Sequence, residues 1–112
     1  MKMVTCITRP VKLQEILDAL TDAGIVGITV TQVQGYGKQG GRVQHFRGLT
    51  YEVRLLPKVR LDIVVADDKL STVVNILLKT ARTGAIGDGK IFVTPVEQAW
   101  RIRTGEAAEA AL

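Results

Sequence analysis

The sequence predicts an α+β sandwich in which two helices cover one face of an antiparallel β-sheet. Two stretches repeat apolar residues at the spacing of an amphipathic helix, and stretches with the two-residue alternation of strands flank each of them. The predicted order is β-α-β, a long loop, β-α-β and a short terminal strand. Two β-α-β halves around one antiparallel sheet make a ferredoxin-like fold, here in a single domain of 112 residues.

The first half begins with a strand over residues 2–8, which the dipeptide Arg9-Pro10 ends. A helix is expected over residues 12–23, because apolar residues recur there at i, i+3, i+4 and i+7. Gly24 follows this stretch as a natural helix stop. Residues 28–35 alternate closely enough to predict the second strand.

The second half repeats the pattern. Residues 58–65 alternate like a strand with one buried face, and Asp67 or Asp68 is expected to cap a helix over residues 70–81. The remaining expected elements are a glycine-rich loop over 83–90, a strand over 91–96, a short strand over 100–103, and a tail that forms a helical turn or frays.

The stretch between the two halves, residues 37–54, has four glycines and no sustained period, so we expect a long functional or mobile loop. Residues 37–58 contain five basic residues and one acidic residue, which accounts for the whole net charge of +4. Such a segment attracts anions such as nucleotides, carboxylates, nucleic acid or an acidic protein face. The alternative is a solvated loop whose charge bias arose by chance.

Composition narrows the class of protein. A hydrophobic content of 46% and a mean hydropathy of +0.18 are high for one small domain, so self-association is expected to cover the open sheet face. We expect no transmembrane span, because the longest charge-free stretch is shorter than the roughly 20 residues that a span needs. We expect no signal peptide either, because no succession of basic, apolar and small residues opens the sequence. A single cysteine, Cys6, suits a reducing cytoplasm, and one cysteine with one histidine, His45, excludes a His/Cys metal site within one chain.

A glycine motif closes the second strand. Residues 35–40 match GxGxxG, the dinucleotide-binding signature, but no helical pattern follows, so that interpretation is rejected. The glycines still let backbone N–H groups approach an anion, and Lys38 adds positive charge. Phosphate contact and a plain flexible turn both remain open.

Two further elements could bind phosphate. Residues 87–90 (GDGK) lack Walker A spacing but could form a small anion nest or simply a tight turn. Arg101 and Arg103 lie at i and i+2 on the expected last strand, which would place both side chains on one face. They make either a polyphosphate clamp or two solvated charges on an edge strand.

Other function classes find little support. The sequence shows no paired carboxylates, no nucleophile elbow and no Cys/His pair for catalysis. The aromatic pattern that RNA-binding versions of this fold require is also missing, so no nucleic-acid partner is expected.

The chain resembles the PII nitrogen-regulatory signal proteins over its full length. The resemblance is strongest in residues 83–93 (TGAIGDGKIFV), and residues 35–39, 46–51, 57–58 and 101–106 add to it. It implies a compact homotrimer of ferredoxin-like subunits with ATP or ADP in each intersubunit cleft. The implied nucleotide-binding residues are Gly35, Gly37, Lys38, Gln39, Val64, Gly87, Asp88, Gly89, Lys90, Arg101 and Arg103.

The resemblance also implies an effector beside the nucleotide. Gln39 matches a Mg²⁺ ligand next to ATP, and 2-oxoglutarate would then meet Lys58 and backbone N–H groups from Gln39 to Gly41. A dianion that enters beside a triphosphate needs a divalent cation to offset the repulsion.

Three segments take family names from the resemblance. Residues 37–54 correspond to the T-loop, 83–90 to the glycine-rich B-loop and 101–112 to the C-terminal segment. In the T-loop, Arg47 matches an arginine that plugs the pore of ammonium channels, and Tyr51 matches the tyrosine that some members have uridylylated or adenylylated. The positions that depart from the usual tip are Phe46, Leu49, Thr50 and Arg54.

The sequence therefore predicts a cytoplasmic, trimeric, non-enzymatic regulator that senses adenylate charge and 2-oxoglutarate. It would dock its T-loop on nitrogen-metabolism enzymes, regulators or an ammonium channel, and would meet the membrane only through such a partner. A slow ATPase activity would not change this interpretation. The alternative is a PII-like nucleotide-binding regulator that responds to another metabolite such as bicarbonate.

Overall fold

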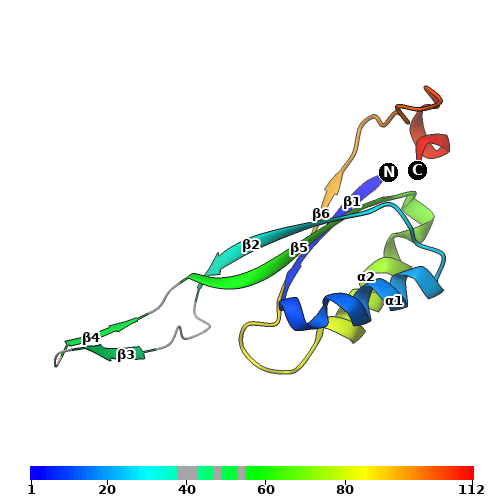
Figure 1. Ribbon diagram of the computed structural model, residues 1–112. Helices are drawn as coiled ribbons and strands as arrows, with labels where there is room; N and C mark the ends of the chain where they lie inside the picture. The colour runs from blue at the N-terminus through cyan, green and yellow to red at the C-terminus, as the bar shows by residue number, and fades with distance from the viewer. Residues whose placement is uncertain (38–42, 47–48, 53–54) are drawn as a thin grey trace.

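A computed structural model describes residues 1–37, 43–46, 49–52 and 55–112 (Figure 1). Four strands form one sheet in the order β2-β5-β1-β6, and every neighbouring pair is antiparallel. Helices α1 and α2 lie side by side on one face of this sheet. The ferredoxin-like α+β fold is confirmed. The bounds are β1 Lys2–Thr8, α1 Leu13–Asp22, β2 Ile28–Tyr36, β5 Leu55–Val65, α2 Leu70–Ala81 and β6 Gly89–Pro95.

The hydrophobic core lies between the helices and the sheet, and it follows the periodicity of the sequence. Every second residue of β1 and β5 faces the helices, and the inward stripes of α1 and α2 complete the layer. Burying one such aliphatic side chain contributes about 1.5–3 kcal/mol. The fully buried aliphatic side chains are Val4, Ile16, Leu20, Leu61, Ile63, Val73 and Leu77.

The predicted end of the first helix is confirmed. Gly24 has a positive φ of 79°, its N–H donates to the Thr21 carbonyl at 2.9 Å, and the N–H of Ile25 donates to the Leu20 carbonyl at 2.9 Å. These two hydrogen bonds together form a Schellman motif, which turns the chain toward β2.

The predicted cap of the second helix was wrong. The 3₁₀ turn Asp67–Lys69 precedes α2, and Ala66 occupies the N-cap position of that turn. The carboxylate of Asp67 is instead 3.0 Å from the α-amino group of Met1 and 3.7 Å from the Lys2 amine. Two positive charges at the start of β1 are stronger partners for a carboxylate than a single backbone N–H.

The long loop expected between the halves contains secondary structure that the sequence did not predict. It contains two short strands, β3 (Val43–Phe46) and β4 (Leu49–Glu52), which pair antiparallel in a separate two-stranded sheet. Four-residue strands are too short for their periodicity to stand out in the sequence. Strand β5 likewise begins at Leu55, before the expected residue 58. Pro57 is tolerated there because β5 pairs only with β2 at this position, which leaves its other edge open.

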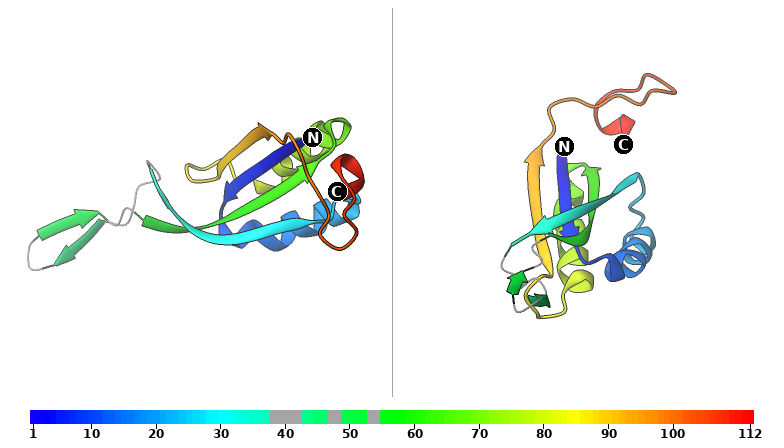
Figure 2. Two further views of the ribbon diagram at one scale, coloured as in Figure 1. Left: turned by 90° about the horizontal axis from the view of Figure 1, so that it is seen from above. Right: turned by 60° about the vertical axis from the view of Figure 1, so that its left-hand side comes forward.

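The short strand expected over residues 100–103 was wrong as well. Trp100 forms an isolated bridge with Ala107, and the chain between them turns back through Gly105, whose φ is 72°. The tail ends in the 3₁₀ helix Ala108–Ala111, which confirms a helical turn there. Figure 2 shows this C-terminal segment leaving the sheet near the N-terminus, at the opposite end of β6 from the B-loop.

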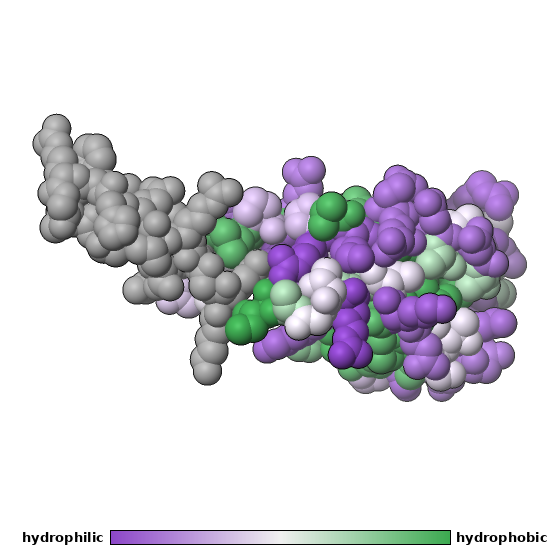
Figure 3. All heavy atoms as spheres, turned by 90° about the horizontal axis from the view of Figure 1, so that it is seen from below, coloured by the Kyte–Doolittle hydropathy of each residue, from purple (hydrophilic) through white to green (hydrophobic). Residues whose placement is uncertain are grey.

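The two faces of the sheet differ. Seen from the helix side, the surface is mainly hydrophilic, with hydrophobic side chains showing between polar ones (Figure 3). On the other face, cross-strand pairs place Ile7 beside Lys90 and Arg60, and Thr5 beside Phe92 and Asp62. Thr5 donates to Asp62 at 2.7 Å, and the Arg60 guanidinium is 3.0 Å from the same carboxylate. This uncovered face leads to the candidate site.

Candidate ligand-binding site

A cavity of about 740 Å³ lies at one end of the sheet, between the B-loop and the end of β2. Three segments that are far apart in the sequence build it: the end of β2, the beginning of β5, and the B-loop with the start of β6. The lining residues are Ile7, Gly35, Tyr36, Gly37, Lys58, Ile86, Gly87, Gly89, Lys90 and Phe92.

Six of the residues singled out from the sequence line this one cavity. They are Gly35, Gly37, Lys58, Gly87, Gly89 and Lys90. Four other candidates, Lys38, Gln39, Gly41 and Arg47, lie outside the described residues. Tyr51 lies in β4, where its backbone pairs with Gln44. Val64, Asp88, Arg101 and Arg103 do not line the cavity.

Lys58 connects two walls of the cavity. The residue is only 7% exposed, and its amine donates to the Gly87 carbonyl at 2.7 Å. Its methylenes pass so close to Gly35 that a Cβ added there would be 3.1 Å from the Lys58 Cγ. Burial lowers the pKa of Lys58, the charge of Arg9 lowers it further, and Asp88 opposes both effects.

The B-loop is held by contacts from its own first residues and from the end of β1. The carboxylate of Asp88 accepts the N–H of Thr83 at 2.8 Å, the N–H of Gly84 at 2.9 Å, the hydroxyl of Thr83, and the Nε–H of Arg9 at 3.2 Å. Hydrogen bonds from Thr83 are the main reason why the pKa of Asp88 lies well below its usual range. The Thr8 hydroxyl donates to the Asp88 carbonyl at 2.8 Å, and Arg9 Nη2 donates to the Ile86 carbonyl at 2.7 Å.

Glycine is required where the loop enters the last strand. Gly89 has a φ of 103°, and a Cβ added there would lie 1.8 Å from the backbone oxygen of Ile7. No side chain fits that space, so the close approach of β6 to β1 depends on this glycine. Gly87, also with a φ of 103°, supplies the turn just before it.

Sequence reasoning missed part of the site. The sequence indicates only that a strand ends at Thr8 and Arg9, yet both side chains hold the B-loop. A fully buried threonine in line with Val4 and Cys6 was the available signal, since a buried hydroxyl needs a partner. Ile7 and Phe92, which give the cavity apolar surface, were also missed because core residues have the same pattern.

The arrangement expected for the two arginines was wrong. Arg101 and Arg103 do not project from one face of a strand, because the chain turns between Trp100 and Ala107. Arg101 Nη1 binds the Glu106 carboxylate at 2.8 Å, and Nη2 donates to the Leu112 carbonyl at 3.1 Å. Both arginines follow β6, whose seven residues span about 20 Å from the cavity end.

Comparison with known proteins identifies the family of this chain. A family model described as "Nitrogen regulatory protein P-II" matches residues 1–106. A relative from Escherichia coli (strain K12), "Nitrogen regulatory protein GlnK", is 53% identical over 112 residues, which is all of both chains. The chain belongs to the PII family. "Nitrogen regulatory protein P-II" of Microchaete diplosiphon is 53% identical over 106 residues, 95% of each chain, and that of Cereibacter sphaeroides is 48% identical over 112, all of both chains.

Membership in the PII family makes this chain a regulatory protein of nitrogen signal transduction. The matched relatives are named as nitrogen regulatory proteins, which agrees with the regulatory role expected from the sequence. Within the described residues, none of the helices combines the length and apolar character that a membrane crossing requires.

Proposed function

We propose that this PII protein binds ATP or ADP in the cavity between the B-loop and the T-loop base, and 2-oxoglutarate together with Mg-ATP. The observation that carries the proposal is the convergence of Lys58, Lys90 and the backbones of Gly87 and Gly89 on one cavity. Two ammonium groups and closely approaching glycine backbones suit a polyphosphate. The ligand state would be transmitted to partner proteins through the T-loop.

The residues of the cavity fit a nucleotide in size and chemistry. A volume of about 740 Å³ is typical of small-molecule sites, and Ile7 and Phe92 offer an apolar surface for a base beside the cationic groups. Gly35 and Gly37 would line the same cleft, with Lys38 beyond them. Val64, Arg101 and Arg103 are remote from the cavity of their own chain, so we assign them to the cleft of a neighbouring copy in a homotrimer.

The effector would bind beside the nucleotide phosphates. Lys58 would hold one carboxylate of 2-oxoglutarate, with Gly41 and the backbone of Gln39 close to the other. The side chain of Gln39 would hold Mg²⁺, which offsets the repulsion between the phosphates and the dianion. Lys58 also contacts Gly87 and Gly35, so a carboxylate that binds its amine would change the contacts of Lys58 with both walls of the site.

The partner would be a nitrogen-metabolism enzyme, a regulator or the cytoplasmic face of an ammonium channel. Arg47 is assigned to docking and Tyr51 to nucleotidyl modification. Phe46, Leu49 and Thr50 depart from the usual T-loop tip of the family and would make this tip more apolar and more basic than the usual one. The protein would act in the cytoplasm without enzymatic turnover of its own, apart from a slow ATPase activity, and without a nucleic-acid partner.

Calorimetry tests the proposal directly. Titration with Mg-ATP and with ADP should give binding heat, and 2-oxoglutarate should give heat only when Mg-ATP is present. Absence of nucleotide binding would contradict the proposed site. Nucleotide binding without a 2-oxoglutarate response would favour the alternative regulator, which bicarbonate titration then tests. Light scattering should return the mass of three chains.

A further inference from the structure

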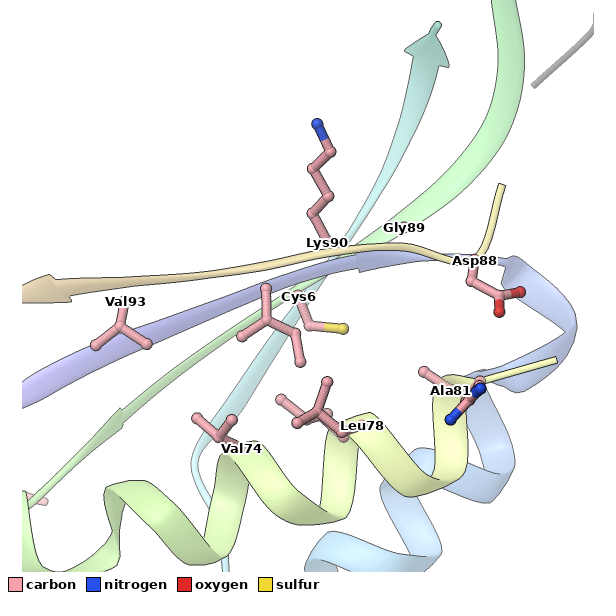
Figure 4. A pocket seen from close by; sticks show the side chains of 11 residues that line it. Cys6, Val74, Leu78, Ala81, Asp88, Gly89, Lys90 and Val93 are labelled. Carbon is pink, nitrogen blue, oxygen red and sulfur yellow. The ribbon is translucent and has the colours of Figure 1, made fainter. Parts of the chain in front are cut away.

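Asp88 lies between two glycines of the cavity wall but directs its carboxylate away from the cavity. Gly87 and Gly89 line the proposed nucleotide cavity, whereas Asp88 lines a second hollow of about 430 Å³ between α2 and β6. Figure 4 shows the Asp88 carboxylate on the α2 side of β6, near Ala81, and the Lys90 side chain on the opposite side. A ligand in the proposed cavity would therefore not meet this carboxylate directly.

The four donors of Asp88 close the B-loop on itself. Its carboxylate binds the N–H groups of Thr83 and Gly84 at the beginning of the loop, although Asp88 stands at its end. The Thr83 hydroxyl and the Arg9 guanidinium complete this set. The segment from Thr83 to Asp88 is thus tied at both ends by one side chain.

The tied loop holds its carbonyl groups in fixed directions. The carbonyls of Ile86, Gly87 and Asp88 each accept a bond from a side chain outside the loop, those of Arg9, Lys58 and Thr8 respectively. In a trans peptide the N–H of the next residue points opposite to the carbonyl. Fixing three successive carbonyls therefore also fixes the directions of the N–H groups of residues 87–89, the backbone that lines the cavity at Gly87 and Gly89.

We propose that Asp88 is a positioning residue that preforms the B-loop for an anion. This inference rests on the proposed nucleotide function of the cavity. It refines the assignment of Asp88 as a nucleotide-binding residue, because the side chain acts through the loop backbone and not by touching the ligand. Its negative charge is offset by the Arg9 guanidinium and by the backbone N–H groups that donate hydrogen bonds to it.

Charge and loop closure predict opposite effects on binding. If Asp88 acted only as a nearby negative charge, removing that charge would tighten the binding of a polyphosphate. If it closes the loop, removing it weakens binding even though the site becomes more positive. Asp88→Asn keeps an amide oxygen that can accept hydrogen bonds from the two backbone N–H groups, whereas Asp88→Ala keeps no side-chain acceptor.

The experiment measures Mg-ATP and ADP affinity by calorimetry for wild type and four variants. Asp88→Ala should bind at least about tenfold more weakly, and Asp88→Asn and Thr83→Val should lie between it and wild type. Asp68→Asn is the matched control: it removes an exposed carboxylate in the 3₁₀ turn before α2 and should leave affinity unchanged. Equal or tighter binding by Asp88→Ala would overturn the proposal.

Hydrogen exchange without nucleotide gives an independent readout. Asp88→Ala should accelerate exchange of the Thr83 and Gly84 amides, and Thr83→Val provides the same test if the alanine variant does not fold. Faster exchange with unchanged affinity would reduce Asp88 to a purely structural role and so contradict the proposal. Failure of the wild type to bind nucleotide would instead contradict the proposed function, while the exchange rates would still report whether the loop is closed.

Discussion

Replacing Gly89 by alanine tests the close packing of β6 on β1 at the edge of the cavity. An L-residue at the left-handed φ of 103° costs roughly 1–2 kcal/mol. The new Cβ would also lie 1.8 Å from the Ile7 backbone oxygen, a clash that no rotamer change can relieve. Strand β6 would have to move away from β1, and each ladder hydrogen bond lost there costs about 0.5–1.5 kcal/mol. We expect a total loss of at least about 3 kcal/mol, a large share of a domain's 5–15 kcal/mol.

Gly24→Ala supplies the matched control. Gly24 also has a positive φ, 79°, but a Cβ there would meet nothing within 4 Å, so only backbone strain of roughly 1 kcal/mol is expected. Urea unfolding followed by circular dichroism, at equal protein concentration, gives the free energy of unfolding for both variants. If Gly89→Ala were no more destabilised than Gly24→Ala, the steric argument for Gly89 would be refuted.

Three further predictions concern the charged groups. Lys58→Met keeps the packing on Gly35 and should abolish the binding heat of 2-oxoglutarate while Mg-ATP still binds. If 2-oxoglutarate still binds, the role assigned to Lys58 is wrong. The double variant Arg101→Ala/Arg103→Ala should bind ATP more weakly. Its free energy of unfolding should change by at most about 1 kcal/mol, since the ion pair of Arg101 with Glu106 is partly exposed. Unchanged ATP affinity would show that neither arginine contributes to the nucleotide site. Because the pKa of Asp88 is lower in the folded chain, its stabilisation is present above about pH 4 and declines as the pH falls. Urea titrations at pH 7 and pH 2 should therefore show the stability gap between wild type and Asp88→Asn narrowing in acid, and a constant gap would contradict the assignment.

The elements that the sequence predicts well are those whose apolar periodicity extends over many residues or that end at a specific helix-stop residue. The stripe of α1 and the stop at Gly24 could be located because a helix and its Schellman turn depend on neighbouring residues alone. The four-residue strands β3 and β4 offered too few residues for a period, and the turn before Ala107 depends on contacts of Arg101 with Glu106. Local propensity does not reveal such contacts.

The residues of the candidate site could likewise be predicted only in part from the sequence. Its glycines and lysines could be identified because their residue types suit an anion wherever they lie. The supporting contacts could not, since Thr8 and Asp88 are 80 positions apart in the chain and meet only once β1 and β6 pair. Nothing near Arg9 in the sequence indicates that its guanidinium will hold the Ile86 carbonyl.

The two walls of the cavity are supported differently, and this bears on how a ligand could signal. The B-loop wall is fixed by Thr8 at the end of β1, by Arg9 directly after it, and by Lys58 of β5. The opposite wall is the end of β2 at Gly35, where the T-loop begins and where Lys58 makes its tightest contact. A ligand that draws the Lys58 amine from the Gly87 carbonyl would shift methylenes that rest on Gly35. We therefore expect Gly35→Ala, which crowds Lys58 at 3.1 Å, to weaken the dependence of partner binding on 2-oxoglutarate more than it weakens nucleotide affinity. Calorimetry and partner pull-down on the same variant measure the two effects, and equal losses in both would refute this division of the site.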